Sequence, residues 1–258
     1  SAGRRLPPSP PGGYGRQGSR TRGNIAVWWL IGIGVAVLAH IAPFPFLFDA
    51  TERTTWRMPA TDPATIYLTF DDGPNPVATP ELLDVLARHG VPATFFVISP
   101  FITDETLPIV RRMFDEGHAV ALHARTRRFL IAHPNVVAAT LQEMAARIEL
   151  LTGHRVCRAF RPKAGHRSVP LLIGAARAGY TVVGWGWMLW DVRLFGERTA
   201  DALVPRLVSR ASPGDIVVVH DGDDDDPRAD RRYAVETIDR LIPALRARGF
   251  QFGTICPQ

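Results

Sequence analysis

From residue 65 onward, short apolar runs alternate with longer segments in which apolar residues recur every three or four positions. The short runs predict buried strands and the periodic segments predict amphipathic helices. The predicted strands are Ile66–Phe70, Ala93–Ile98, Ala119–Leu122, Cys157–Phe160, Thr181–Trp185, Ile216–His220 and Phe250–Ile255. The predicted helices are Pro80–His89, Glu105–Glu116, Val136–Leu151, Val169–Ala178, Ala200–Ala211 and Tyr233–Arg248. This alternation is typical of an α/β domain with a parallel sheet, and seven strands in this rhythm favour a barrel.

The first 61 residues differ in composition and divide into three parts. Residues 1–23 consist mainly of Pro, Gly, Ser and Arg, which predicts a disordered basic tail. Residues 24–48 contain no Asp, Glu, Lys or Arg, and an apolar stretch of 18 residues runs from Ile25 to Ala42. That length is close to the roughly 20 residues that a helix needs to cross a bilayer. Residues 49–61 are predicted to be a linker, and residues 62–258 the folded domain.

The charges on either side of the apolar stretch predict its orientation. Arginines precede it, and Asp49 and Glu52 follow it, so the positive-inside rule places the N-terminus in the cytoplasm. We therefore expect a single-pass, uncleaved anchor in the cell membrane with an extracytoplasmic domain. A cleaved signal peptide is the alternative, but its apolar core would be shorter, and no clear small-x-small cleavage site is present.

The charge distribution argues against a nucleic-acid partner. The net charge is +5, and five arginines of the predicted tail equal that whole excess: Arg4, Arg5, Arg16, Arg20 and Arg22. The acidic run Asp223–Asp226 lacks the alternating ligands of a calcium loop and is predicted to be a solvated loop. No feature of the sequence predicts a protein partner.

The chain has two cysteines, Cys157 and Cys256. Two are too few for a disulfide scaffold, and they lack the spacing of a zinc site. The sequence leaves two alternatives open, one structural bridge outside the cytoplasm or two buried thiols.

Polar, titratable residues recur where the predicted strands end. They are Asp71 and Asp72, His123, Arg161, Asp191 and His220, and Ala164 and Trp187 lie in the same segments. Taken singly, an Asp-Gly pair is more often a turn and a lone histidine is more often structural. Because the carboxyl ends of parallel strands meet at one edge of a sheet, five such coincidences instead favour a shared active site.

These segments resemble the motifs of polysaccharide deacetylases with a NodB-homology domain, carbohydrate esterase family 4. The sequence Thr69–Pro74 resembles the first motif, Arg161–Gly165 the Arg-Pro-Pro-Tyr-Gly motif, Trp187–Asp191 the fourth motif, and Val217–Asp221 the Leu-x-His motif. The resemblance covers about residues 62–256. It implies a distorted (β/α) barrel and a metal-dependent hydrolase that removes acetyl groups from an N-acetylated cell-surface polysaccharide, such as peptidoglycan or a chitin-like glycan.

The resemblance also implies how such a hydrolase would activate water. Asp71 would be the general base, and Arg161 would orient it and hold it ionised. Asp72 and His123 would bind a divalent metal, most often zinc, that polarises the acetyl carbonyl.

Further residues would act on the sugar and the leaving group. His220 would protonate the departing amine, and Asp191 would raise the pKa of His220 and fix its tautomer. The Ala164 N–H would be an oxyanion donor, and Trp187 would offer a flat apolar face to a sugar ring.

One position departs from the family pattern. The second family motif has two metal-binding histidines four residues apart, whereas here His123 is followed by Arg127, whose guanidinium stays protonated and cannot coordinate a cation. Either Asp72, His123 and water hold a metal weakly, or Arg127 replaces its charge, or the site has lost hydrolysis. His133 and His166 are near in sequence but are predicted to lie in solvated loops. The alternative function is therefore a catalytically silent, membrane-anchored glycan-binding protein on the same fold.

Overall fold

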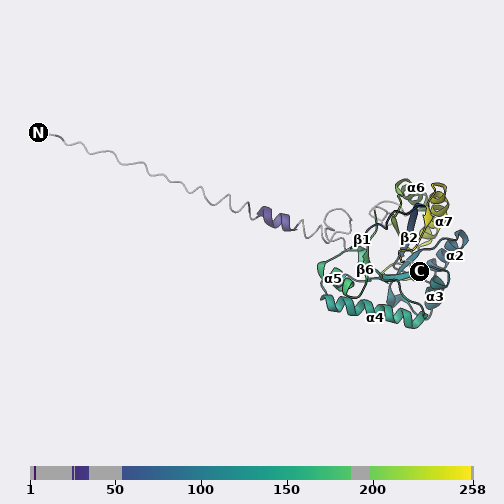
Figure 1. The fold of residues 1–258 in the computed structure, drawn as a ribbon, viewed down its shortest axis with the longest axis horizontal. Helices are drawn as coiled ribbons and strands as arrows, with labels where there is room; N and C mark the ends of the chain where they lie inside the picture. The colour runs from purple at the N-terminus through teal and green to yellow at the C-terminus, as the bar shows by residue number, and fades with distance from the viewer. Residues whose placement is uncertain (1–2, 4–24, 26, 35–53, 187–197, 257–258) are drawn as a thin grey trace. The chain divides into compact units, whose positions relative to one another are not determined.

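The computed structural model describes residues 3, 25, 27–34, 54–186 and 198–256 (Figure 1). The chain divides into two units, Ser1–Ala39 and His40–Gln258. In the first unit, residues 27–34 are helical, and the large side chains of Trp28 and Trp29 are exposed. Within the described residues, no helix combines the length and apolar character needed to cross a bilayer. Most of the segment predicted to be a membrane anchor, including residues 35–48, lies outside the described residues.

The second unit is built on a curled parallel sheet with the strand order β1-β6-β5-β4-β3-β2-β7, and β8 pairs with β2. The strands are β1 (Thr54–Thr55), β2 (Thr65–Asp71), β3 (Thr94–Val97), β4 (Ala119–His123), β5 (Ala159–Arg161), β6 (Thr181–Val183), β7 (Ile216–His220) and β8 (Gln251–Phe252). An antiparallel bridge between Arg57 and Asp215 joins the two ends of this order, and the Arg57 guanidinium bonds the Asp215 carboxylate at 2.5 Å. The sheet therefore has the form of a distorted (β/α) barrel.

Helices cover the outer face of the sheet (Figure 1). They are α2 (Ala78–His89), α3 (Leu107–Asp115), α4 (Pro134–Thr152), α5 (Val169–Arg177), α6 (Ala200–Arg210) and α7 (Arg232–Ala247). All seven predicted strands and all six predicted helices are present. Strand β1 was not predicted, because a two-residue strand carries no periodic pattern and lies in the segment expected to be a linker.

The strands alternate between two apolar clusters, as the two-residue repeat of a pleated strand requires. In β2, Ile66, Leu68 and Phe70 pack with the helices in the larger cluster. Tyr67 belongs to a smaller cluster inside the barrel, together with Phe96 and Ala121. Residues at alternate positions that share the face of Tyr67 have the inner parity of their strand and point into the barrel. At the carboxyl ends of the strands, these positions include the candidate site predicted from the sequence.

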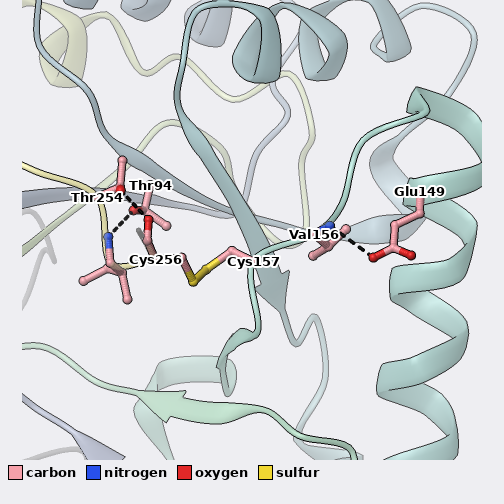
Figure 2. The surroundings of a disulfide bond; sticks show 7 residues. Thr94, Glu149, Val156, Cys157, Thr254 and Cys256 are labelled. Atoms are coloured by element: carbon pink, nitrogen blue, oxygen red, sulfur yellow. Dashed lines mark hydrogen bonds between the residues drawn. A yellow bond between two sulfur atoms is a disulfide. The ribbon is translucent and has the colours of Figure 1, made fainter. Parts of the chain in front are cut away.

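The amino ends of the strands are joined by a disulfide between Cys157 and Cys256, shown in Figure 2. The chain after β8 crosses the start of β3, where the Ile255 N–H donates to the Thr94 hydroxyl at 3.0 Å. Cys256 then meets Cys157, whose N–H donates to the Val120 carbonyl at 2.8 Å. Of the two alternatives that the sequence left open, the structure contains the bridge.

Candidate active site

A buried ion pair between Asp71 and Arg161 forms the base of the site. Asp71 ends β2 and Arg161 ends β5, and both have the inner parity of their strands. The Arg161 Nη1 donates to Asp71 Oδ1 at 2.5 Å and to the Thr69 hydroxyl at 2.9 Å. Its guanidinium lies 3.9 Å from the centre of the Phe96 ring, and Nη2 donates to the Gly184 carbonyl at 3.0 Å. These contacts hold the Asp71 carboxylate in one orientation at the barrel mouth.

Burial and charge act in opposite directions on this pair. Arg161 has no exposed surface and Asp71 is 2% exposed. Burial lowers the pKa of Arg161, while the Asp71 carboxylate opposes that change. A buried charge is tolerated only when it is paired and hydrogen-bonded. Arg161 is paired and hydrogen-bonded through its contacts with Asp71, Thr69 and Gly184. These contacts fix the position of the pair.

Asp72 and His123 form a second pair next to the first. Asp72 Oδ1 and His123 Nε2 lie 3.1 Å apart, and both side chains are largely buried. Burial alone would raise the pKa of Asp72, but the hydrogen bond and charge of His123, with smaller contributions from His220 and Arg231, lower it to about 2. Asp72 is therefore a carboxylate at any physiological pH, as a cation ligand must be. The other ring nitrogen, His123 Nδ1, is buried without a hydrogen-bond partner in the described part of the chain.

His220 and Asp221 lie on the other side of β2. His220 is the register partner of Asp71 and is partly exposed. The next residue, Asp221, is buried, and the Thr79 hydroxyl donates to its Oδ2. Burial, with the charges of Asp72 and Asp71, raises the pKa of Asp221 to about 7. Sequence reasoning gave Asp221 no role, although its place directly after His220 was the available signal.

Gly73 packs directly on this buried acid. A Cβ on Gly73 would lie 2.5 Å from Asp221 Oδ2, closer than any side chain could be tolerated. The glycine is therefore needed for close approach of the two loops, and the Asp71-Asp72-Gly73 turn and the end of β7 form one packed unit.

Two residues of the site have backbone angles that side chains avoid. Asp72 has φ of 69° and Ala164 has φ of 50°, and no other non-glycine residue with positive φ occurs in the residues that the structure describes. The left-handed region is unfavourable for residues with a Cβ, and such outliers cluster at functional sites. The Ala164 residue is exposed, and its N–H donates to no other described residue. A free N–H in this position suits an oxyanion donor.

Three other candidate residues make no hydrogen bond or ion pair with Asp72 or His123 within the described ranges. Arg127 is exposed in the short helix η2 (Arg127–Leu130). His133 caps α4, with its Nδ1 accepting from the Asn135 N–H at 3.2 Å, and His166 Nδ1 lies 3.3 Å from the Lys163 carbonyl. Neither histidine replaces the missing metal ligand. The predicted residues Trp187 and Asp191 lie outside the described residues.

Asp72 and His123 supply part of the set of ligands that a divalent cation needs. A separation of 3.1 Å between Asp72 Oδ1 and His123 Nε2 suits two ligands that each lie about 2 Å from one ion. At the sequence position where the family motif has its second histidine, this chain has Arg127, which cannot coordinate. Across the described ranges, the only group of three potential metal ligands is Asp223–Asp225, which includes neither of the two donors. Among the residues that the structure describes, Asp72 and His123 are thus the two ligands that this site offers.

Comparison with known proteins agrees with this geometry. The chain matches the family described as Polysaccharide deacetylase over residues 59–183. It is 38% identical over 204 residues to a chitooligosaccharide deacetylase of Sinorhizobium fredii, covering 74% of this chain and 89% of that protein. The structure of the Bc1960 peptidoglycan N-acetylglucosamine deacetylase superposes with a TM-score of 0.69 at 26% identity, covering 82% of this chain and 94% of the other.

A second solved structure is that of a family 4 acetyl xylan esterase from Clostridium thermocellum in complex with a cobalt ion. Its TM-score is 0.63 at 27% identity, covering 74% of this chain and 88% of that chain. The fold and site thus define a hydrolase of the (β/α) barrel type. The chain belongs to the polysaccharide deacetylase family, carbohydrate esterase family 4, and is a deacetylase-like hydrolase of the class that cleaves amide bonds other than peptide bonds. Members of this family generally depend on a divalent metal.

Proposed function

We propose that the chain is a metal-dependent hydrolase that removes acetyl groups from an N-acetylated cell-surface polysaccharide. The observation that carries the proposal is the buried Asp71–Arg161 pair directly beside the Asp72–His123 pair. Burying a carboxylate against an arginine contributes little to stability, and sugar binding alone does not require it. A positioned base next to a cation site is what amide hydrolysis requires.

Asp71 would accept the proton of the attacking water. Arg161 occupies Asp71 Oδ1, and no described residue donates to Oδ2, which leaves that oxygen available as the base. Because Arg161 is buried against Asp71 and donates to it, Asp71 keeps its orientation while Oδ2 accepts the proton.

Asp72 and His123 would hold the divalent cation, for which zinc is our proposal. When bound, such an ion supplies Lewis-acid polarisation of the acetyl carbonyl and of water. With two ligands from the described residues, the affinity for the cation should be lower than at a site with three. Arg127 is exposed and would not contribute a ligand.

The remaining roles concern the oxyanion and the leaving group. The Ala164 N–H would donate to the oxygen that becomes negatively charged. His220, next to Asp71 across the β2–β7 pair, would protonate the departing amine. We retain Asp191 as the residue that orients His220, and Trp187 as a sugar-stacking surface.

We further propose that the domain is held outside the cytoplasm by an N-terminal membrane anchor. The apolar stretch that begins at Ile25, with arginines before it, supports this location. The Cys157–Cys256 disulfide also supports it, because such bonds persist in oxidising compartments.

Acetate release by the purified full chain tests the proposal. We expect release from N-acetylglucosamine oligomers after reconstitution with Zn²⁺ or Co²⁺, and loss of release after chelation. Acetylated xylan is the matched ester substrate that separates O-deacetylation from N-deacetylation. Arg127 is the observation that favours the alternative, a silent glycan-binding protein; binding of the oligomers without any acetate release in the metal-loaded protein would support that alternative and refute the hydrolase.

A further inference from the structure

The turn that carries Ala164 is tied to a loop on the far side of the barrel mouth. Lys163, two residues after the end of β5, forms an ion pair between its ammonium group and the Asp224 carboxylate. Arg125, two residues after the end of β4, donates from Nε to the Asp224 backbone carbonyl at 2.9 Å. Asp224 follows β7, which is three strands away from β4 in the sheet order. A single residue thus links loops that follow three strands.

The loop that presents Asp224 is internally ordered. Asp223 Oδ1 accepts from the N–H groups of Asp225 and Asp226 at 3.0 and 3.2 Å. Asp223 Oδ2 accepts from Arg231 Nη2 at 2.7 Å. The prediction that this acidic run is a solvated loop is therefore wrong for its first half, since Asp223 and Asp224 are partly buried and paired with cations. Asp224 is consequently a fixed point to which another loop can be attached.

The Lys163–Gly165 turn, η3, needs such an attachment. Ala164 has a left-handed φ that disfavours any residue with a Cβ. Two bonds close the turn, from the Gly165 N–H to the Pro162 carbonyl at 2.9 Å and from the His166 N–H to the Lys163 carbonyl at 3.2 Å. Lys163 stands where the family motif has a second proline, whose ring would fix φ. Lysine has no such restriction, so its side-chain ion pair adds a restraint to the two backbone bonds of the turn.

We propose that Lys163 and Asp224 are positioning residues, whose ion pair holds the Lys163–Gly165 turn so that the Ala164 N–H points at the reacting carbonyl oxygen. This inference rests on the proposed function. Neither side chain needs to touch the acetyl group, because the effect acts through the backbone of Ala164. The partly buried pair, with side chains 25% and 22% exposed, is shielded enough from water to keep its strength.

Two single variants and their combination test the pair in the full chain. In K163M and in D224N, kcat for acetate release should fall about tenfold while KM stays within about twofold, since a slightly misplaced donor weakens transition-state binding only. The double variant should be no worse than either single variant, and K163R should recover most of the loss. The matched control is R228M, which removes a cation of the same loop whose partner is Glu105, and it should keep the wild-type kcat.

Hydrogen exchange supplies a readout that does not depend on activity. The Gly165 and His166 amides should exchange faster in K163M than in wild type, with no change in R228M. If K163M keeps the wild-type kcat and the wild-type exchange rates, the inference is wrong. Acetate release by the wild type would still support the proposed function in that case. A wild-type chain that releases no acetate would refute the proposed function, and faster exchange in K163M would then still establish that the pair orders the turn.

Discussion

The two ends of the barrel sheet are built on opposite principles. At the carboxyl ends, titratable groups are buried against one another in the Asp71–Arg161 and Asp72–His123 pairs. At the amino ends, a disulfide crosses the sheet, and a cavity of about 620 Å³ is lined by Cys256 and by aromatic and basic side chains. Burying the two pairs costs desolvation energy, whereas the disulfide stabilises the fold by constraining the unfolded chain.

One scaffold thus separates reactivity, at the carboxyl ends of the strands, from stability, at the amino ends. The buried acid–base pairs and the left-handed backbone at the carboxyl ends are unfavourable features that persist because the surrounding structure holds them. At the amino ends, the buried Asp215 is paired with an Arg57 side chain that is half exposed. Burial lowers the pKa of His118 to about 4, so this histidine is neutral at pH 7, although Glu116 opposes the change. Changes at the carboxyl ends should therefore alter rate and metal binding, and changes at the amino ends should alter stability.

The largest effect is expected for D71N. Asparagine cannot accept a proton, so kcat for acetate release should fall by about two to four orders of magnitude, the usual contribution of a general base. Acetate release from N-acetylglucosamine oligomers measures it, with circular dichroism as the control for folding. A folded D71N protein with kcat within tenfold of wild type would contradict the assignment of Asp71 as base.

The next largest effect belongs to the amino ends. The paired variant C157A/C256A removes a bridge that closes a loop of 99 residues, and the free energy of unfolding should fall by about 2–5 kcal/mol. Urea unfolding of the oxidised wild type and of the variant measures the difference. In the folded variant kcat should be unchanged; a fall in kcat comparable to that of D71N would show that the two ends are not separable.

Much of this division could be anticipated from the sequence. Strand ends and two-residue alternation predict that Asp71, His123 and Arg161 face one another, because both rules are local and the strands are regular. The apolar runs likewise predict the helices α2 to α7 and the strands β2 to β8.

Other features depend on contacts that no local pattern records. The Arg57–Asp215 bridge joins residues 158 positions apart, so the closure of the barrel is not visible along the chain. The acidic run looks like a solvated loop until Lys163 and Arg231 are brought to it by folding. The left-handed φ of Ala164 is similarly hidden, since alanine gives no signal for that conformation.

Protonation of His118 makes the stability of the amino ends depend on pH. His118 is 3% exposed, and its pKa is lowered from 6.5 to about 4 by burial. As pH falls from about 6.5 to about 4, the unfolded chain binds a proton that the folded chain does not, so stability falls over this window by about 3 kcal/mol. Asp221, whose pKa is raised from 3.8 to about 7, acts in the opposite direction over the whole of this window.

The variant H118Q should isolate the contribution of His118. Thermal unfolding between pH 4 and pH 7 should show a smaller loss of stability on acidification than in wild type. H154Q is the matched control, because His154 lines the same cavity but its side chain is 44% exposed. If H118Q and wild type lose stability equally, the buried neutral state assigned to His118 is wrong.

The smallest expected effect returns to the carboxyl ends, at Arg127. In R127H an imidazole replaces the guanidinium at the position where the family motif has its second histidine, and a third ligand should raise the affinity for Zn²⁺ or Co²⁺ about tenfold, which corresponds to about 1.4 kcal/mol. Metal titration by calorimetry measures this change. R128H is the matched control, since Arg128 is the neighbouring exposed arginine of η2. An equal gain in R128H, or none in R127H, would contradict the assignment of position 127 to the cation site. A gain in metal affinity in R127H alone, with the metal-free melting temperature unchanged, would show that metal binding at the carboxyl ends can be altered without a change in the stability of the fold.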